Sequence, residues 1–143
     1  MGTVMLKVVA GLVAGLIVAL AAIYVIWLVA LQVYPLPVEG GIRSLESEGA
    51  LIESMPTGAL LFVALAWFGG AFIGALTAAH ISRRLWPAWV IAFLVAAISI
   101  SNIVMFPHPT WMQLAAVIVP VLGGLIATHM ARRSLGSAIV AHG

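Results

Sequence analysis

Four long apolar runs dominate the pattern of hydrophobic and polar positions along the chain. They cover residues 8–31, 58–79, 88–106 and 110–128, and none of them contains Asp, Glu, Lys or Arg. About 20 apolar residues in a helix cross a hydrocarbon core of roughly 30 Å. Backbone groups in lipid must bond to one another, which favours helices, and the runs lack the alternation of a membrane barrel. We therefore predict an all-α polytopic membrane four-helix bundle. It forms a single domain over 1–143, with helices at about 4–34, 57–82, 87–106 and 110–133 and an outer loop at 35–56.

The composition agrees with this pattern. Hydrophobic residues make up 64% of the 143 residues and charged residues 7%, whereas ordinary globular proteins have roughly 45–50% and about 25%. So few charges exclude a soluble enzyme, a nucleic-acid-binding protein and a disordered chain. The absence of cysteine excludes disulfides, thiolate-bound metals and thiol catalysis.

The charged residues separate onto two sides of the predicted bundle. Lys7, Arg83, Arg84, Arg132 and Arg133 fall on the side of both termini, while the loop at 35–56 holds Arg43 and all four glutamates. Because Lys and Arg are enriched in cytoplasmic loops, we predict that both termini are cytoplasmic. The two arginine pairs are expected to contact anionic lipid headgroups there.

The outer loop mixes apolar residues with its glutamates. We interpret it as a solvated loop, and a short helix in the headgroup plane is the alternative. Glycines at 40, 41 and 49 count against that helix.

The two halves of the chain share a motif. Residues 74–84 and 123–133 are identical at six of eleven positions, and both segments contain His-x-x-Arg-Arg. This similarity indicates two helical hairpins in parallel orientation, an arrangement known among transporters. The alternative is that the motif is simply a common way to end a helix at a membrane surface.

Small residues recur every four positions along the predicted helices. Close backbone approach drives helix association in lipid, where the hydrophobic effect between helices is absent. We call these rows of small residues the small-residue stripes. They serve either packing inside the bundle or an interface with a second copy or another membrane subunit. Their residues are Gly11, Gly15, Ala66, Gly70, Gly74, Ala78, Gly123 and Ala127.

Few polar side chains lie within the apolar runs. Charged residues in membrane spans are functional candidates, and their absence here argues against an enzyme and against a proton-coupled antiporter. A polar cluster of Ser99, Ser101 and Asn102 remains. It is expected either to bond neighbouring helices or to contact a solute.

Two sets of residues could bind a cofactor or a metal. His80 and His129 lie at matching positions of the repeated motif and could ligate a haem b, although a histidine at a helix C-terminus is also favoured by the helix dipole. Met105, His108 and Met112 flank the turn between the last two helices. Thioether and imidazole ligands suit Cu(I), so this turn is a second, weaker candidate.

Two segments resemble a group of small bacterial four-helix membrane proteins without an assigned activity. The similarity lies in Met55–Gly74 and in the Pro-His-Pro-Thr-Trp stretch of 107–111. The resemblance implies a bacterial inner-membrane protein and transfers no catalytic residue to this chain.

The sequence thus predicts a non-catalytic membrane protein that works through helix–helix association, either as a homo-oligomer or as an accessory subunit. A small oligomeric transporter or channel for a small solute is the alternative. A bis-histidine haem electron carrier is the third hypothesis.

Overall fold

The structure is a computed structural model that describes residues 2–35 and 45–141, with side chains described for 2–35 and 50–136. It is all-helical, with 91% of residues in helices and no strand in the described part. The five helices are α1 (Gly2–Val33), α2 (Leu45–Ser54), α3 (Thr57–Ser82), α4 (Trp86–Met105) and α5 (Thr110–Ala141). Four of them, α1, α3, α4 and α5, are long and apolar enough to cross a membrane. The predicted all-α four-helix bundle is therefore confirmed.

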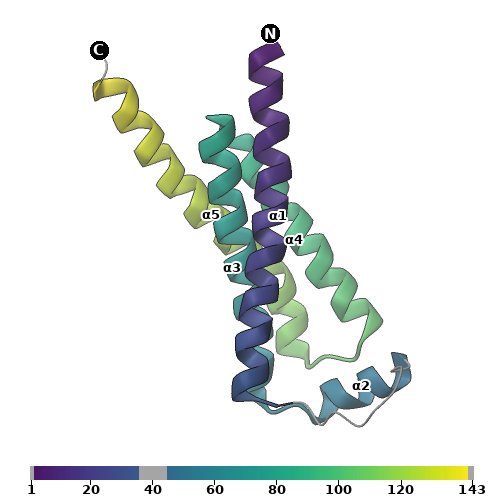
Figure 1. The fold of residues 1–143 in the computed structure, drawn as a ribbon. Helices are drawn as coiled ribbons and strands as arrows, with labels where there is room; N and C mark the ends of the chain where they lie inside the picture. The colour runs from purple at the N-terminus through teal and green to yellow at the C-terminus, as the bar shows by residue number, and fades with distance from the viewer. Residues whose placement is uncertain (1, 36–44, 142–143) are drawn as a thin grey trace.

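The two chain ends lie at the same end of the bundle (Figure 1). The short helix α2 and the turn between α4 and α5 lie at the opposite end. Helices α1 and α4 run in one direction and α3 and α5 in the other, as two hairpins in parallel orientation would. We call the two ends the termini end and the α2 end.

Helix α3 is the centre of the bundle. It packs against α1, α4 and α5, whereas α1 has no comparable contact with α5. Alanine and glycine occupy most of its buried positions, among them Gly70, Ala71, Gly74, Ala75 and Ala78. Because these side chains are so small, three helices can approach α3 closely on different faces.

Helices α1 and α3 approach each other closely through their glycines. A Cβ atom added at Gly74 would lie 2.7 Å from the carbonyl oxygen of Gly15 and 2.6 Å from the Cβ of Ala19. A Cβ atom added at Gly15 would lie 2.8 Å from the carbonyl oxygen of Gly74. The two glycine stripes therefore face each other within one chain.

All the predicted interface residues take part in this internal packing. Gly11 faces Ala78 and Ser82, and Gly70 faces Ile23. Gly123 of α5 faces Phe68 and Ala71, and Ala66 and Ala127 are buried as well. In the structure these stripes serve packing inside the bundle, the first of the two alternatives, because helices of the same chain cover the residues.

The His-x-x-Arg-Arg motif ends α3 but not α5. At the end of α3 the Ser82 hydroxyl donates to the carbonyl of Arg84 at 3.1 Å and accepts from its amide at 3.2 Å, and Arg83 has a φ of 57°. Pro87 follows in the first turn of α4. The segment after Arg133 has no such turn, so α5 continues to Ala141 instead of ending near 133 as predicted.

The loop predicted over 35–56 contains a helix, α2. Its last turn is closed by the Ser54 hydroxyl, which donates to the carbonyl of Leu51 at 2.7 Å. Ile52 and Met55 pack against a small core at the α2 end formed by Leu60, Trp67, Met112 and Ala116. This apolar anchoring explains a helix where a solvated loop was predicted. Residues 36–44, including Glu39 and Arg43, lie outside the described part.

Candidate functional site

The two histidines of the repeated motif, the candidate haem ligands, lie in different environments. The Nδ1–H of His80 donates to the carbonyl of Leu76 at 2.8 Å, and its Nε2 bonds the hydroxyl of Ser134 on α5 at 3.0 Å. Both ring nitrogens therefore form hydrogen bonds in this structure. His129 is exposed on α5. The structure shows His80 as a link between α3 and α5 rather than as an axial ligand.

The proposed copper ligands lie in different environments. Met112 is fully buried in the core at the α2 end, while Met105 is 59% exposed on α4. His108, in the turn between them, uses Nδ1 to bond the carbonyl of Phe106 at 2.8 Å. One sulfur in the core and one on the surface do not converge on a metal ion, so this prediction is wrong.

The polar cluster divides into three separate roles. Ser99 is fully buried, and its hydroxyl lies 2.6 Å from the carbonyl oxygen of Ala116, which joins α4 to α5. Ser101 is exposed and bonds the carbonyl of Ala97 in its own helix at 2.8 Å. Asn102 is half-buried, and its amide bonds no group within the described part of the chain. Only Asn102 is therefore available to a ligand.

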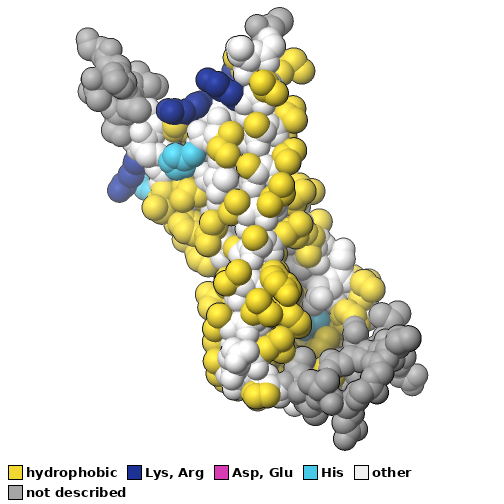
Figure 2. Space-filling view, viewed as in Figure 1, with side chains coloured by type: hydrophobic (Ala, Val, Ile, Leu, Met, Phe, Trp, Pro, Cys, Tyr) yellow, Lys and Arg dark blue, Asp and Glu magenta, His cyan; other side chains and the backbone are white. Residues whose placement is uncertain are grey.

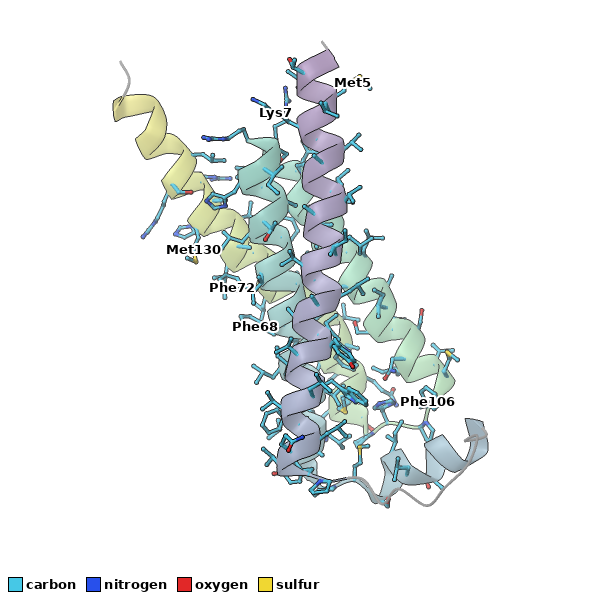
Figure 3. The ribbon with its side chains drawn as sticks, in the orientation of Figure 1. Met5, Lys7, Phe68, Phe72, Phe106 and Met130 are labelled. Carbon is cyan, nitrogen blue, oxygen red and sulfur yellow. The ribbon has the colours of Figure 1, made fainter. Side chains whose placement is uncertain are left out.

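The basic side chains are at the termini end, as the sequence predicts. On the face drawn in Figure 2, Lys and Arg side chains appear only near that end, and Figure 3 labels Lys7 there. Arg83, Arg84, Arg132 and Arg133 are all exposed. Their positions suit contact with the headgroups of one leaflet.

A cleft between α1, α3 and α4 is the most distinctive feature near the α2 end. Ile91 of α4 touches the positions of Gly15 and Gly74, so the three helices meet in the half of the bundle nearer the termini. Toward the α2 end α4 leans away from α1 (Figure 1). A cavity of about 330 Å³ opens between them, and its aromatic and polar lining comprises Tyr24, Trp27, Phe62, Trp67, Asn102 and His108. We call it the α1–α4 cleft.

The aromatic wall of the cleft comes mainly from α1. Tyr24 and Trp27 stack with ring centroids 5.9 Å apart and remain 58% and 45% exposed. Trp67 of α3 is buried behind them. The hollow between α1 and α4 is visible beside the apolar surface of α1 in Figure 2. The cleft is thus open, mostly apolar and of the size of small-molecule sites, which begin at roughly 300 Å³.

A second cavity of about 340 Å³ lies beside the cleft at the α2 end. Its lining includes Glu53, Thr57 and Trp111, and four residues line both cavities: Ile52, Met55, Leu60 and His108. We call this second cavity the Glu53 groove. A groove that holds a carboxylate and a mostly apolar cleft therefore adjoin across one shared wall.

Sequence reasoning did not find this site. The residues come from α1, α2, α3, α4 and the turn before α5, and no spacing along the chain connects them. Asn102 and His108 stood out in the sequence, Asn102 with contact to a solute as one of two alternatives and His108 as a copper ligand. The one local signal was Tyr24 and Trp27, three residues apart on one helix face, because aromatic residues deep within an apolar run often mark a contact surface.

No protein-family model, curated protein or solved structure matches this chain. The fold and the cleft together define the class: an all-helical protein with four helices fit to cross a membrane and a lateral cleft at one end. The function is therefore inferred from the residues of this chain.

Proposed function

We propose that this chain is a non-catalytic multi-pass protein of a bacterial inner membrane that acts by association with another molecule inside the bilayer. The α1–α4 cleft is the place of that association. The observation that carries this proposal is an open apolar cavity, within a bundle whose small-residue faces are already used internally.

The location in a bacterial inner membrane is supported by the charge distribution. It is also supported by the resemblance of residues 55–74 and 107–111 to small bacterial four-helix membrane proteins. Lys7 and the two arginine pairs lie at the termini end, which the positive-inside rule assigns to the cytoplasm. Both termini are then cytoplasmic. The α1–α4 cleft and the Glu53 groove face the outer side.

A non-catalytic role is supported by how the polar side chains are used. The four apolar runs contain no charged residue. Ser99 bonds α5 and His80 bonds Ser134, so both contribute to helix packing. This leaves the Asn102 amide and His108 at the cleft, which suit recognition of a ligand rather than chemistry on it.

The test compares two substitutions of neighbouring residues on α4. Asn102→Phe fills the cleft, whereas Ser101→Phe adds the same side chain on the exposed side of the helix. Native mass spectrometry from the protein's own membrane reports the 14.9 kDa chain and whatever it retains. We expect the wild type and Ser101→Phe to retain a bound lipid, subunit or second copy and Asn102→Phe to lose it. A wild-type chain that carries nothing, or equal loss in both variants, contradicts the proposal.

A small-solute transporter is the second candidate, favoured by the Asn102 amide, which lines the cleft without a partner in the described structure. Flux of a small solute into proteoliposomes tests this alternative. It is supported if Asn102→Leu abolishes the flux and Ser101→Ala leaves it intact. Equal flux in all three proteins, or none in any of them, contradicts it.

A further inference from the structure

The wall shared by the α1–α4 cleft and the Glu53 groove suggests what kind of molecule occupies them. A ligand that extends through both would place one part among Tyr24, Trp27 and Trp67 and another beside Glu53 and Thr57. The first environment is apolar and aromatic, and the second adds one carboxylate and one hydroxyl to apolar walls. This division matches an amphiphile, with its chain in the cleft and its head in the groove.

His108 faces both cavities, and its protonation pattern follows from its hydrogen bond. Its Nδ1 lies 2.8 Å from the carbonyl oxygen of Phe106, and a carbonyl only accepts, so Nδ1 carries the hydrogen. In the neutral ring Nε2 is then an acceptor. In that form the residue offers a lone pair to a ligand at the shared wall.

Glu53 adds a negative charge to the same groove. Its carboxylate is exposed and only accepts hydrogen bonds. An acceptor-rich, negatively charged groove favours a cation that carries N–H donors and disfavours an anionic head.

We infer that the cleft and groove together bind an amphiphile with a primary ammonium head group. The ammonium donates to the Glu53 carboxylate and to Nε2 of His108, and one hydrocarbon chain lies between α1 and α4. This inference rests on the proposed function and specifies the partner at the same site. The occupant comes from the bilayer itself, because the cleft lies among the apolar exposed faces of α1 and α4.

The experiment compares two phospholipids with the same acyl chains. Phosphatidylethanolamine has a primary ammonium with three N–H donors, and phosphatidylcholine has the same charge with none. Each is titrated into the delipidated full chain in detergent and counted by native mass spectrometry. We expect the ethanolamine lipid to bind at least fivefold more tightly, because only its head group donates hydrogen bonds and one net hydrogen bond corresponds to about that factor.

Substitutions locate the selectivity. Glu53→Gln is expected to weaken binding of the ethanolamine lipid more than binding of the choline lipid, because only the ethanolamine head donates hydrogen bonds to the carboxylate. His108→Leu is expected to reduce the preference as well. The control is Glu48→Gln, which removes the same charge from the same segment of sequence. Equal losses in Glu53→Gln and Glu48→Gln overturn the assignment to Glu53, since the effect is then one of overall charge.

Failure of this inference can be told apart from failure of the proposed function. If both lipids bind equally and Asn102→Phe blocks both, association at the cleft stands and the ammonium head is excluded. If neither lipid binds, or Asn102→Phe affects neither, the cleft is not a lipid site and the inference fails with it. Retention of a protein subunit in the earlier experiment would then identify a different occupant.

Discussion

At the scale of single residues, glycine and alanine set the distances between helices. Gly15 and Gly74 face each other so closely that each would place a Cβ atom within 2.8 Å of the other's carbonyl oxygen. Without a hydrophobic force between helices in lipid, such close contact is the main source of packing energy. A single methyl group at this point separates α1 from α3.

Gly74→Ala is therefore expected to lower the free energy of unfolding by about 1–3 kcal/mol, the usual cost of overpacking a tight core. Gly136→Ala is the matched control, since nothing lies within 4 Å of a Cβ atom there. That variant should gain up to about 1 kcal/mol from helix propensity. Unfolding in mixed detergent followed by circular dichroism measures both. A Gly74→Ala variant as stable as Gly136→Ala would show that α1 and α3 are not in close contact.

At the scale of elements, the same motif acts differently in α3 and α5. In α3 it precedes a Ser82-bonded turn and Pro87, and the helix ends. In α5 the helix continues, and Ser134 just beyond the motif bonds His80 of α3. Two equivalent histidines therefore have unequal roles, since His80 joins two helices and His129 is exposed.

His80→Ala is expected to loosen the end of α5 because it removes this bond. A neutral hydrogen bond contributes about 1 kcal/mol, so amide hydrogen exchange beyond Ala131 should accelerate about fivefold. His129→Ala should leave exchange there unchanged. Mass spectrometry of deuterated peptides makes the comparison. Equal acceleration in both variants, or none in His80→Ala, would contradict the role given to His80.

At the scale of the whole molecule, charge and topology agree on one orientation. The termini end carries Lys7 and the arginine pairs, and Glu53 is at the α2 end. Because the chain has no cysteine, single cysteines can report which side of the membrane each end faces.

We expect Ser54→Cys, at the end of α2, to react with a membrane-impermeant maleimide in intact spheroplasts. Gly136→Cys, on α5, should react only after the membrane is permeabilised, because the positive-inside rule assigns the termini end to the cytoplasm. Both positions are exposed, so accessibility within the fold does not bias the result. The reverse pattern would invert the proposed orientation and place the α1–α4 cleft on the cytoplasmic side.

The helices were predictable because each depends on a local property. Runs of apolar residues without charge predicted α1, α3 and α4 to within a few residues, and proline marked the starts of α3, α4 and α5. The end of α5 was not predicted correctly. The feature that ends α3 is a turn held by the Ser82 hydroxyl, and not the arginine pair itself. Helix α2 was missed because its stability depends on Ile52 and Met55 packing against residues far along the chain.

The sequence alone determined that the chain is a helical bundle, because apolar length and backbone hydrogen bonding in lipid leave few other structures. It also determined which residues are small enough for close packing. Only the tertiary structure decided whether those residues meet one another or a second chain, and that Asn102 faces a cleft while Ser99 joins two helices. The physical reason is that the cleft exists only where α4 diverges from α1, and that divergence depends on contacts among three helices. The spacing of residues within one helix does not encode it.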